Sequence, residues 1–290
     1  MAKGTLADRI RLRLGELSPA ERRVGRVLLA DYPAAGFETV ANVAERAGVS
    51  APTVLRFVTR FGFQGFPDFQ AGLRAELDER SASPLTLYEA GDRTGGPAEH
   101  PADEDLLSQG RRVFTAALEQ TYAELPPHDL ERAIELLGDP KRRIVLTGGR
   151  FTHHLAQYLA LHLMQLRDGV SVLSERPVER TTAVTGWNRR DVLVVFDYRR
   201  YEKDKMALAE LLGERGGRVV LFTDTWLSPV AAHSEVVLAT QVTAPSPYDS
   251  LVPTMALIET VVAGLVQTLG EDAHARLKEG ERLAQATGLV

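Results

Sequence analysis

Six residues between positions 50 and 60 carry side chains suited to contact with nucleic acid. They combine short hydroxyl or methyl groups with two arginines on the expected exposed face of one helix: Ser50, Ala51, Thr53, Arg56, Thr59 and Arg60. An arginine can donate two parallel hydrogen bonds to a guanine in the major groove, and hydroxyls and arginines also bind backbone phosphates. We expect Arg56, in the middle of the helix, to read bases and Arg60, near its end, to contact phosphate.

Two amphipathic helices joined by a tight turn must position these side chains. Apolar residues recur at helical spacing before the turn and after it: Val40, Val43, Ala44 and Ala47, then Val54, Phe57, Val58 and Phe61. Gly48 allows positive φ in the turn, Ser50 stands at the N-cap of the second helix, and Pro52 fits its first turn. The alternative is an ordinary helical hairpin with solvated arginines. Because turn, cap and both stripes occur together, we interpret the stretch as a helix-turn-helix.

A second group of residues has the chemistry to hold a small anion. Its members follow predicted strands or lie next to predicted helix starts: Gly148, Arg150, Thr152, His153, Asp197, Arg199, Arg200 and Ser250. Arginines clamp carboxylates or phosphates, and free N–H groups at a helix N-terminus attract anions. We expect one of Arg199 and Arg200 to pair with Asp197 or Glu202, and the other to face the cleft with Arg150. The open alternative is that these arginines only neutralise acids in an emptied site.

Short apolar runs that alternate with helices predict the sheet that would position this second group. Strands are expected at 144–147, 170–173, 192–196, 218–222 and 235–239, and helices at 152–166, 203–215 and 251–269. Runs that are apolar on both faces and alternate with crossover helices specify a parallel sheet covered on both sides. Ligands bind such sheets beyond the carboxyl ends of the strands, which here means residues 148–154, 197–203 and 224–229.

The chain is expected to divide into residues 1–80, a linker at 81–103 and residues 104–290. Helices at 5–14, 19–31 and 68–79 would complete a five-helix first domain, with Phe63, Phe66 and Phe69 in its core. The linker is rich in Gly, Pro and small polar residues, and helices at 104–124 and 129–137 precede the sheet. The fold class is therefore α plus α/β: an all-helical domain followed by a parallel-sheet, flavodoxin-like α/β domain.

Amino-acid composition argues against several classes of protein: membrane, secreted and cysteine-dependent ones. The 290 residues are 44% hydrophobic and 25% charged, as in an ordinary soluble protein. A signal peptide and an apolar run of about 18 residues are both absent, so we predict a cytoplasmic protein without membrane contact. The absence of cysteine excludes disulfides and thiolate metal sites. Net charge is −5, but residues 1–80 hold 12 Lys and Arg against 10 Asp and Glu, so DNA binding would depend on local placement of charge.

Several short motifs resemble those of RpiR-type bacterial transcription regulators. In about the first 80 residues they are Ser18-Pro19-Ala20-Glu21-Arg22-Arg23-Val24, Val43-Ala44, Gly48-Val49-Ser50, Thr53-Val54 with Arg56-Phe57, and Phe61-Gly62-Phe63 with Gly65-Phe66. Residues 105–270 resemble the sugar-isomerase (SIS) domain that follows in this family, through the Gly148 turn with Thr152, Ser228-Pro229-Val230-Ala231, Ser250 and the long helix after it. The resemblance implies a DNA-binding regulator that senses phosphorylated sugars.

Two departures from the family pattern lie in the ligand loops. The usual Gly-x-Gly-x-Ser is replaced by Gly148-Gly149-Arg150-Phe151-Thr152, and the hydroxyl-rich Ser-x-Ser-Gly-x-Thr loop by Asp197-Tyr198-Arg199-Arg200-Tyr201-Glu202. An aspartate repels phosphate, whereas the arginines need space and anionic partners. We therefore expect a small carboxylate or other anion that differs from the family's usual ligands, with Ser250 contributing from the partner subunit.

The combined prediction is a transcription regulator that binds a double-stranded DNA operator as a homodimer or tetramer. A small anionic effector, a sugar phosphate or a carboxylate, would modulate this binding, and we expect no catalytic residue, cofactor or metal site. Two alternatives remain open: a vestigial second domain that only dimerises, and a sugar-phosphate isomerase or lyase. Catalysis would need a positioned acid or base. His153 and His154 are adjacent and so point to different faces, and no metal spacing joins them to His162.

Overall fold

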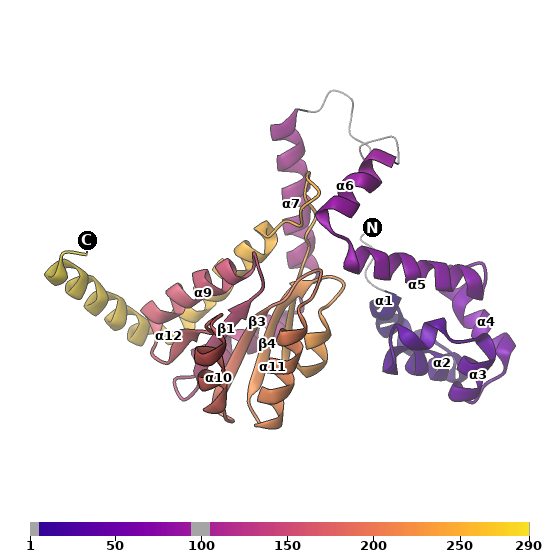
Figure 1. Ribbon diagram of the computed structural model, residues 1–290, viewed down its shortest axis with the longest axis horizontal. Helices are drawn as coiled ribbons and strands as arrows, with labels where there is room; N and C mark the ends of the chain where they lie inside the picture. The colour runs from indigo at the N-terminus through magenta and orange to yellow at the C-terminus, as the bar shows by residue number, and fades with distance from the viewer. Residues whose placement is uncertain (1–5, 94–104, 290) are drawn as a thin grey trace. The chain divides into compact units, whose positions relative to one another are not determined.

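The computed structural model describes residues 6–93 and 105–289, which fall into two compact units that divide after Ala82. The first unit contains the five predicted helices: α1 Leu6–Arg13, α2 Pro19–Ala30, α3 Val40–Ala47, α4 Ala51–Arg60 and α5 Phe66–Ser81 (Figure 1). Short 3-10 helices occupy Leu14–Glu16 and Ala34–Phe37. Helix α2 begins as predicted: the Ser18 hydroxyl accepts from the Glu21 N–H and the Glu21 carboxylate accepts from the Ser18 N–H.

One apolar core holds the first unit together. It combines side chains from α1 to α5 that are almost completely buried, among them Ile10, Val24, Leu28, Val43, Val54, Phe57, Val58, Phe61 and Phe69. The predicted aromatic cluster is confirmed as packing: Phe69 stacks on Phe66 and meets the edge of Phe63, with ring centroids 5.4 Å apart in each pair. This core fixes which sides of α3 and α4 remain accessible.

The predicted linker is not free of regular structure. Helix α6, Pro84–Arg93, occupies its first half, although the segment is rich in Gly, Pro and small polar residues. Local capping explains the helix, because the Ser83 hydroxyl accepts from the Thr86 N–H and Pro84 stands at the first helical position. Residues 94–104 of the predicted linker lie outside the described residues.

The second unit contains a five-stranded parallel sheet in the order β2-β1-β3-β4-β5, which confirms the predicted fold class. The strands are β1 Arg143–Gly148, β2 Val170–Val172, β3 Asp191–Phe196, β4 Arg218–Asp224 and β5 Val236–Thr240. The register pairs Gly148 with Phe196 and Phe196 with Phe222, so the carboxyl ends of the three central strands meet at one edge. The order reverses between β1 and β3, and that edge is where ligands bind in sheets of this kind.

Helices cover both faces of the sheet, as the doubly apolar strands require. They are α7 Leu106–Glu124, α8 Pro127–Gly138, α9 His153–Leu166, α10 Pro177–Thr185, α11 Lys203–Glu214 and α12 Val252–Thr287 (Figure 1). Ile144 and Leu146 pack toward the α8, α9 and α12 side, whereas Val145 faces the α11 side. Helix α10 was not predicted. None of its residues is buried, so its sequence lacks the apolar stripe that reveals a helix.

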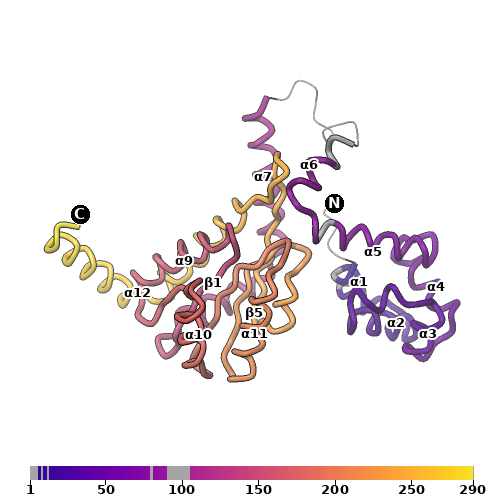
Figure 2. The backbone as a smooth tube through the Cα atoms, in the orientation of Figure 1, coloured from indigo at the N-terminus to yellow at the C-terminus, as the bar shows by residue number. Residues whose placement is uncertain are grey.

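Helix α12 is longer than predicted. A break at Gly270, where φ is 50° and ψ is −119°, follows the predicted end at Leu269, and a second helical stretch then reaches Thr287. Figure 2 shows these last turns, in yellow, extending past the sheet. By length and hydropathy α12 is the one helix in the described part of the chain that could cross a membrane. Its Leu257, Ile258 and Val261 side chains are instead fully buried against the sheet's helical layer.

Candidate nucleic-acid interface and ligand pocket

The turn between α3 and α4 has the predicted geometry. Gly48 adopts φ 60° and ψ 43°, and the N–H of Val49 donates to the carbonyl of Ala44 at 2.9 Å. A left-handed residue followed by such a bond closes the C-terminus of α3 and reverses the chain within a few residues. Ser50 then stands at the N-cap of α4, and Pro52 lies in the first turn. The two helices therefore form the compact pair expected of a helix-turn-helix.

The outer face of α4 carries most of the side chains predicted there, with one correction. Ser50, Arg56, Thr59 and Arg60 are exposed and Ala51 is partly exposed. Thr53 is only 6% exposed, contrary to its predicted place on the outer face. The physical reason is helical periodicity, because Thr53 precedes the buried Phe57 by one turn and lies on the same side of the helix.

The two arginines of α4 have different environments. The Arg56 guanidinium is exposed, and its Nη2 donates to Thr53 Oγ1 at 3.1 Å. Arg60 instead bonds within the protein, because its Nη1 lies 3.4 Å from a Glu21 carboxylate oxygen and its Nη2 donates to the Glu16 carbonyl at 2.9 Å. Arg60 thereby ties the end of α4 to the start of α2. This arrangement weakens the predicted role of Arg60 as a phosphate contact.

Further arginines, which the sequence analysis did not select, secure the turn before α4 and the end of α4. Arg23 of α2 donates from Nε to the Ala47 carbonyl at 3.1 Å and from Nη2 to the Gly48 carbonyl at 3.4 Å, at the turn. Arg9 of α1 donates to the Phe61 carbonyl, just past the helix end. These bonds satisfy carbonyls that the helix termini leave without partners. They also fix the direction in which α4 presents Arg56.

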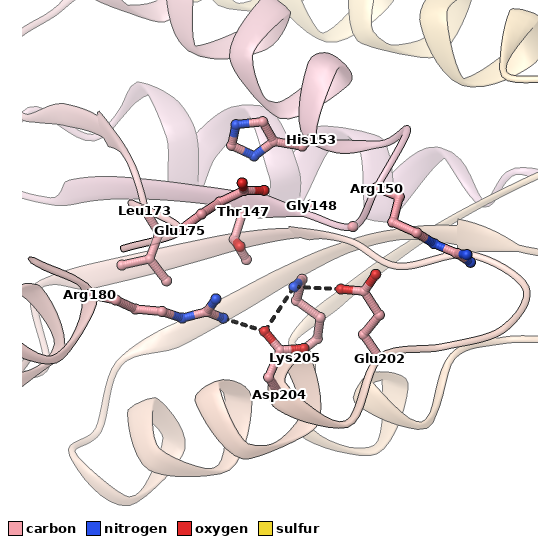
Figure 3. A pocket seen from close by; sticks show the side chains of 11 residues that line it. Thr147, Gly148, Arg150, His153, Leu173, Glu175, Arg180, Glu202, Asp204 and Lys205 are labelled. Carbon is pink, nitrogen blue, oxygen red and sulfur yellow. Dashed lines mark hydrogen bonds and ion pairs between the residues drawn. The ribbon is translucent and has the colours of Figure 1, made fainter. Parts of the chain in front are cut away.

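The second unit holds a cavity of about 190 Å³ at the carboxyl ends of β1 and β3, where the strand order reverses (Figure 3). Its walls come from β1 and the turn after it, the start of α9, the segment after β2, α10 and the start of α11. The lining residues are Thr147, Gly148, Gly149, Arg150, His153, Leu173, Glu175, Arg180, Glu202, Asp204 and Lys205. Three of the residues predicted to bind an effector, Gly148, Arg150 and His153, are among them.

The turn after β1 requires glycine at position 148. A Cβ atom there would lie 2.5 Å from both the carbonyl carbon and the oxygen of Thr152, and 2.6 Å from the His153 nitrogen, all in the backbone. The Thr152 hydroxyl stabilises the same turn, because it accepts from the Gly149 N–H at 2.8 Å and donates to the Phe196 carbonyl at 2.9 Å. Its only proton is therefore committed, which corrects the expectation that Thr152 supplies a donor to the ligand.

Asp197 and Arg199, which follow β3, do not line this cavity. Asp197 is 3% exposed, and its carboxylate accepts from the Glu202 N–H at 3.2 Å and from the Ser228 hydroxyl. Burial raises the pKa of Asp197 to about 6, although both hydrogen bonds and Lys205 oppose the increase. Within the described residues neither Arg199 nor Arg200 pairs with Asp197 or Glu202, so the predicted ion pair is wrong.

Arg199 is instead held by residues from later segments. Its Nη2 lies 3.1 Å from a carboxylate oxygen of Asp249, and its guanidinium lies 4.1 Å from the centre of the Trp226 ring. Its backbone N–H donates to the buried Asp224 carboxylate at 2.6 Å. The Arg199 side chain is only 8% exposed, so the expectation that it faces a ligand cleft is also corrected.

Two other predicted effector residues lie outside the cavity. Arg200 is exposed, with a positive φ of 71°, and does not line it. Ser250 is buried, and its hydroxyl accepts from the Val252 N–H at 3.2 Å at the start of α12. Of the eight predicted residues, three line the cavity, four form bonds within the protein, and Arg200 is exposed outside the cavity.

The charged floor of the cavity was missed by the sequence analysis. Lys205 is 3% exposed and lies 2.9 Å from carboxylate oxygens of both Glu202 and Asp204, and Arg180 of α10 pairs with Asp204. Figure 3 shows these four side chains as one connected network. Two cations and two anions cancel, so the network adds little net charge. A sequence signal existed, because Glu202, Asp204 and Lys205 open the helix that follows β3, at a predicted ligand edge.

Two known domain families match the two units of this chain. Residues 4–80 match the helix-turn-helix domain of the rpiR family, and residues 137–264 match the SIS domain. The HTH-type transcriptional regulator HexR of Pseudomonas aeruginosa is 26% identical over 280 residues, covering 94% of this chain and 93% of that protein. The chain belongs to the RpiR-type transcription regulators.

One further relative and two solved structures resemble all or part of this chain. HexR of Escherichia coli is 24% identical over 282 residues, covering 94% of this chain and 92% of its own. The sugar isomerase domain of an RpiR transcription factor from Sphaerobacter thermophilus matches 62% of this chain with a TM-score of 0.57 and 26% identity. The NanR protein of Vibrio vulnificus, solved in complex with ManNAc-6P, matches 98% with a TM-score of 0.55 at 17% identity, a likeness of fold.

Proposed function

We propose that this RpiR-type regulator reads its operator through the outer face of α4, with Arg56 as the base-contacting side chain. The observation that supports this choice is the contrast between the two arginines: Arg60 is bonded to α2, whereas Arg56 extends from the exposed middle of the helix. Ser50 is exposed beside it and suits a phosphate contact, whereas the Thr59 hydroxyl donates its proton to the Leu55 carbonyl at 3.0 Å. Arginine in this position can make bidentate hydrogen bonds to guanine.

The test begins with operator sequences that the full-length protein selects from a random duplex library. Arg56→Ala is expected to weaken binding to the selected duplex by about 1 to 3 kcal/mol, the usual range for a lost base contact, without lowering the melting temperature. Arg74→Ala on α5 is the matched control, because it removes an exposed arginine outside the helix-turn-helix. Equal affinity of Arg56→Ala and wild type would exclude this face.

We also propose that a small anionic metabolite, a sugar phosphate or a carboxylate, binds in the cavity at the ends of β1 and β3 and modulates operator binding. Arg150 supports this assignment, because it is the lining arginine or lysine without a hydrogen bond or ion pair within the described residues (Figure 3). Gly148 brings the backbone close to the start of α9, and His153 adds a second polar group to the wall. Arg150 and His153 are therefore the proposed ligand contacts.

A thermal-shift screen of the full chain against hexose 6-phosphates, sugar acids and inorganic anions tests this proposal. Anionic compounds that bind should raise the melting temperature and change operator affinity, and Arg150→Gln should abolish both effects. Arg200→Gln is the control, since Arg200 is exposed and outside the cavity lining. Ligand responses that persist unchanged in Arg150→Gln would exclude the site.

A second candidate function is that this domain binds no effector and only dimerises. One observation favours it: the charged side chains of the cavity neutralise one another, namely Arg180, Asp204, Lys205 and Glu202. The same screen separates the two readings, because a dimerisation-only domain gives no ligand response. Relatives that match nearly the whole chain are named as transcriptional regulators, so a regulatory role is preferred to catalysis by a SIS-type isomerase. A regulator of this type would act in the cytoplasm, where its operator lies.

We propose that the second unit carries the homodimer contact. Exposed apolar side chains on the packed helices α9 and α12 support this, namely Leu161, Met164 and Val266, which are 62%, 40% and 41% exposed. A two-fold operator requires a symmetric protein, and apolar helical surfaces suit a symmetric contact. Sedimentation of the full chain at micromolar concentration tests this assignment: Leu161→Lys should produce monomers, and a variant with an unchanged sedimentation coefficient would contradict it.

A further inference from the structure

The N-cap of α4 breaks a local rule. A serine at this position normally accepts a hydrogen bond from a backbone N–H in the first turn of its helix. Ser50 has the extended backbone of an N-cap, with φ −82° and ψ 151°, yet its side chain makes no capping bond. Ser18 and Thr39, at the N-caps of α2 and α3, both make one. The Ser50 hydroxyl oxygen therefore has a different hydrogen-bond partner.

That partner is the hydroxyl of Thr53. Ser50 Oγ lies 3.0 Å from Thr53 Oγ1, and Nη2 of Arg56 donates to the same Thr53 oxygen at 3.1 Å. A hydroxyl has one proton and two lone pairs, so Thr53 can accept from Arg56 while donating to Ser50. In this arrangement the Ser50 proton remains available to an outside acceptor. Two hydrogen bonds thus join the three side chains along one edge of α4, and this hydrogen-bonded chain is called the relay below.

Burial makes Thr53 the fixed member of the relay. It is 6% exposed and belongs to the rigid side of α4, whereas Ser50 and Arg56 are both exposed. A long arginine side chain loses rotational freedom when it binds, and a hydrogen bond to a fixed neighbour removes part of that freedom beforehand. Among the residues that the structure describes, Arg56 uses one N–H group in a hydrogen bond, which leaves the others for a base edge.

We propose that Thr53 is a positioning residue for operator recognition, which holds the Arg56 guanidinium in its reading orientation. This inference rests on the proposed role of Arg56. It predicts that a buried hydroxyl without any DNA contact of its own contributes to sequence discrimination. Packing alone would make valine, which has the same shape as threonine, an equivalent residue at position 53.

The experiment compares Thr53→Val and Thr53→Ser in the full chain. The probes are the duplex selected by the wild-type protein and a scrambled duplex of the same length. Thr53→Val is expected to weaken binding to the selected duplex about three- to tenfold, the range for ordering one long side chain, and to leave binding to the scrambled duplex unchanged. Thr53→Ser keeps the hydroxyl and should retain wild-type discrimination. If Thr53→Val does not fold, Thr53→Ala removes the same hydroxyl without added bulk.

A double-mutant cycle distinguishes positioning from a structural effect. In an Arg56→Ala background, Thr53→Val should cause no further loss, because the side chain that it positions is absent. Full discrimination in Thr53→Val, or an equal loss on both duplexes, would overturn the inference while leaving the role of Arg56 intact. Unchanged operator binding by Arg56→Ala alone would instead overturn the proposed reading face, and the Thr53 inference with it.

Discussion

The buried Asp197 carboxyl allows a quantitative prediction about stability and pH. Burial raises its pKa from the ordinary 3.8 to about 6, against the opposing effects of the Ser228 hydroxyl, the Glu202 N–H and Lys205. A carboxyl with a raised pKa is bound to its proton more tightly in the folded state, so its ionisation opposes folding. The stability that the protonated carboxyl contributes is fully present below about pH 4 and is lost as the pH rises through about 4 to 6. At 1.36 kcal/mol for each tenfold change in proton affinity, the complete loss is about 3 kcal/mol.

Asp197→Asn removes this ionisation with little change of shape. The amide oxygen can still accept from the Glu202 N–H, and the Ser228 hydroxyl can rotate to accept from the amide nitrogen. Between pH 4.5 and 7.5 the stability of the variant relative to wild type should rise by about 2 kcal/mol, the part of the titration within that interval. For a unit of this size, that is about 4–8 °C in melting temperature.

The assay is thermal or urea unfolding of wild type, Asp197→Asn and Glu271→Gln across this pH interval, followed at the transition of the second unit. Glu271 is a suitable control because its side chain is fully exposed. A stability difference between Asp197→Asn and wild type that does not change with pH would refute the reasoning. It would mean that the two hydrogen bonds and Lys205 offset the cost of burial.

Three further predictions follow from corrected positions. Arg60→Ala is expected to lower the melting temperature of the first unit, because it removes the bonds to Glu21 and Glu16. The salt dependence of DNA binding should stay unchanged. A salt slope reduced by about one would instead indicate a phosphate contact. Gly148→Ala places a Cβ atom against the Thr152 backbone and should abolish the ligand-induced thermal shift, so a soluble variant with a normal shift would contradict the turn geometry. Arg199→Ala leaves Asp249 without its cation and should destabilise the second unit by about 1–3 kcal/mol in urea titrations, with the effector response retained; loss of that response without destabilisation would restore Arg199 to the ligand site.

Local patterns were sufficient to predict most elements of both units. The period of Val54, Phe57 and Phe61 defines α4, and Gly48 and Ser50 define its turn and start, because these signals depend on residues only a few positions apart. The same reasoning located all five strands within two residues of their observed ends. It failed for α10, which buries no side chain, and for α6, whose cap at Ser83 lies in a segment of linker-like composition.

The partners of long charged side chains could not be predicted in this way. Arg60 bonds to Glu21 across 39 positions of the chain, and Arg199 pairs with Asp249 across 50. A guanidinium can reach several neighbouring elements, so its partner depends on which elements the fold brings together. The sequence therefore placed arginines near both candidate sites. It assigned Arg60 to DNA phosphate and Arg199 to the effector, whereas in the structure they bind the carboxylates of Glu21 and Asp249.

What the sequence by itself determined was the set of elements, the parallel α/β class and the helix-turn-helix, because hydrophobic period and turn chemistry are local properties. The tertiary structure alone decided which of those residues remain available to a partner. It buries Thr53 beneath Arg56, commits the Thr152 proton to the Phe196 carbonyl, and closes Lys205 into an ion-pair network. Availability depends on desolvation and on pairing with residues far away in the chain, and neither quantity is contained in local spacing.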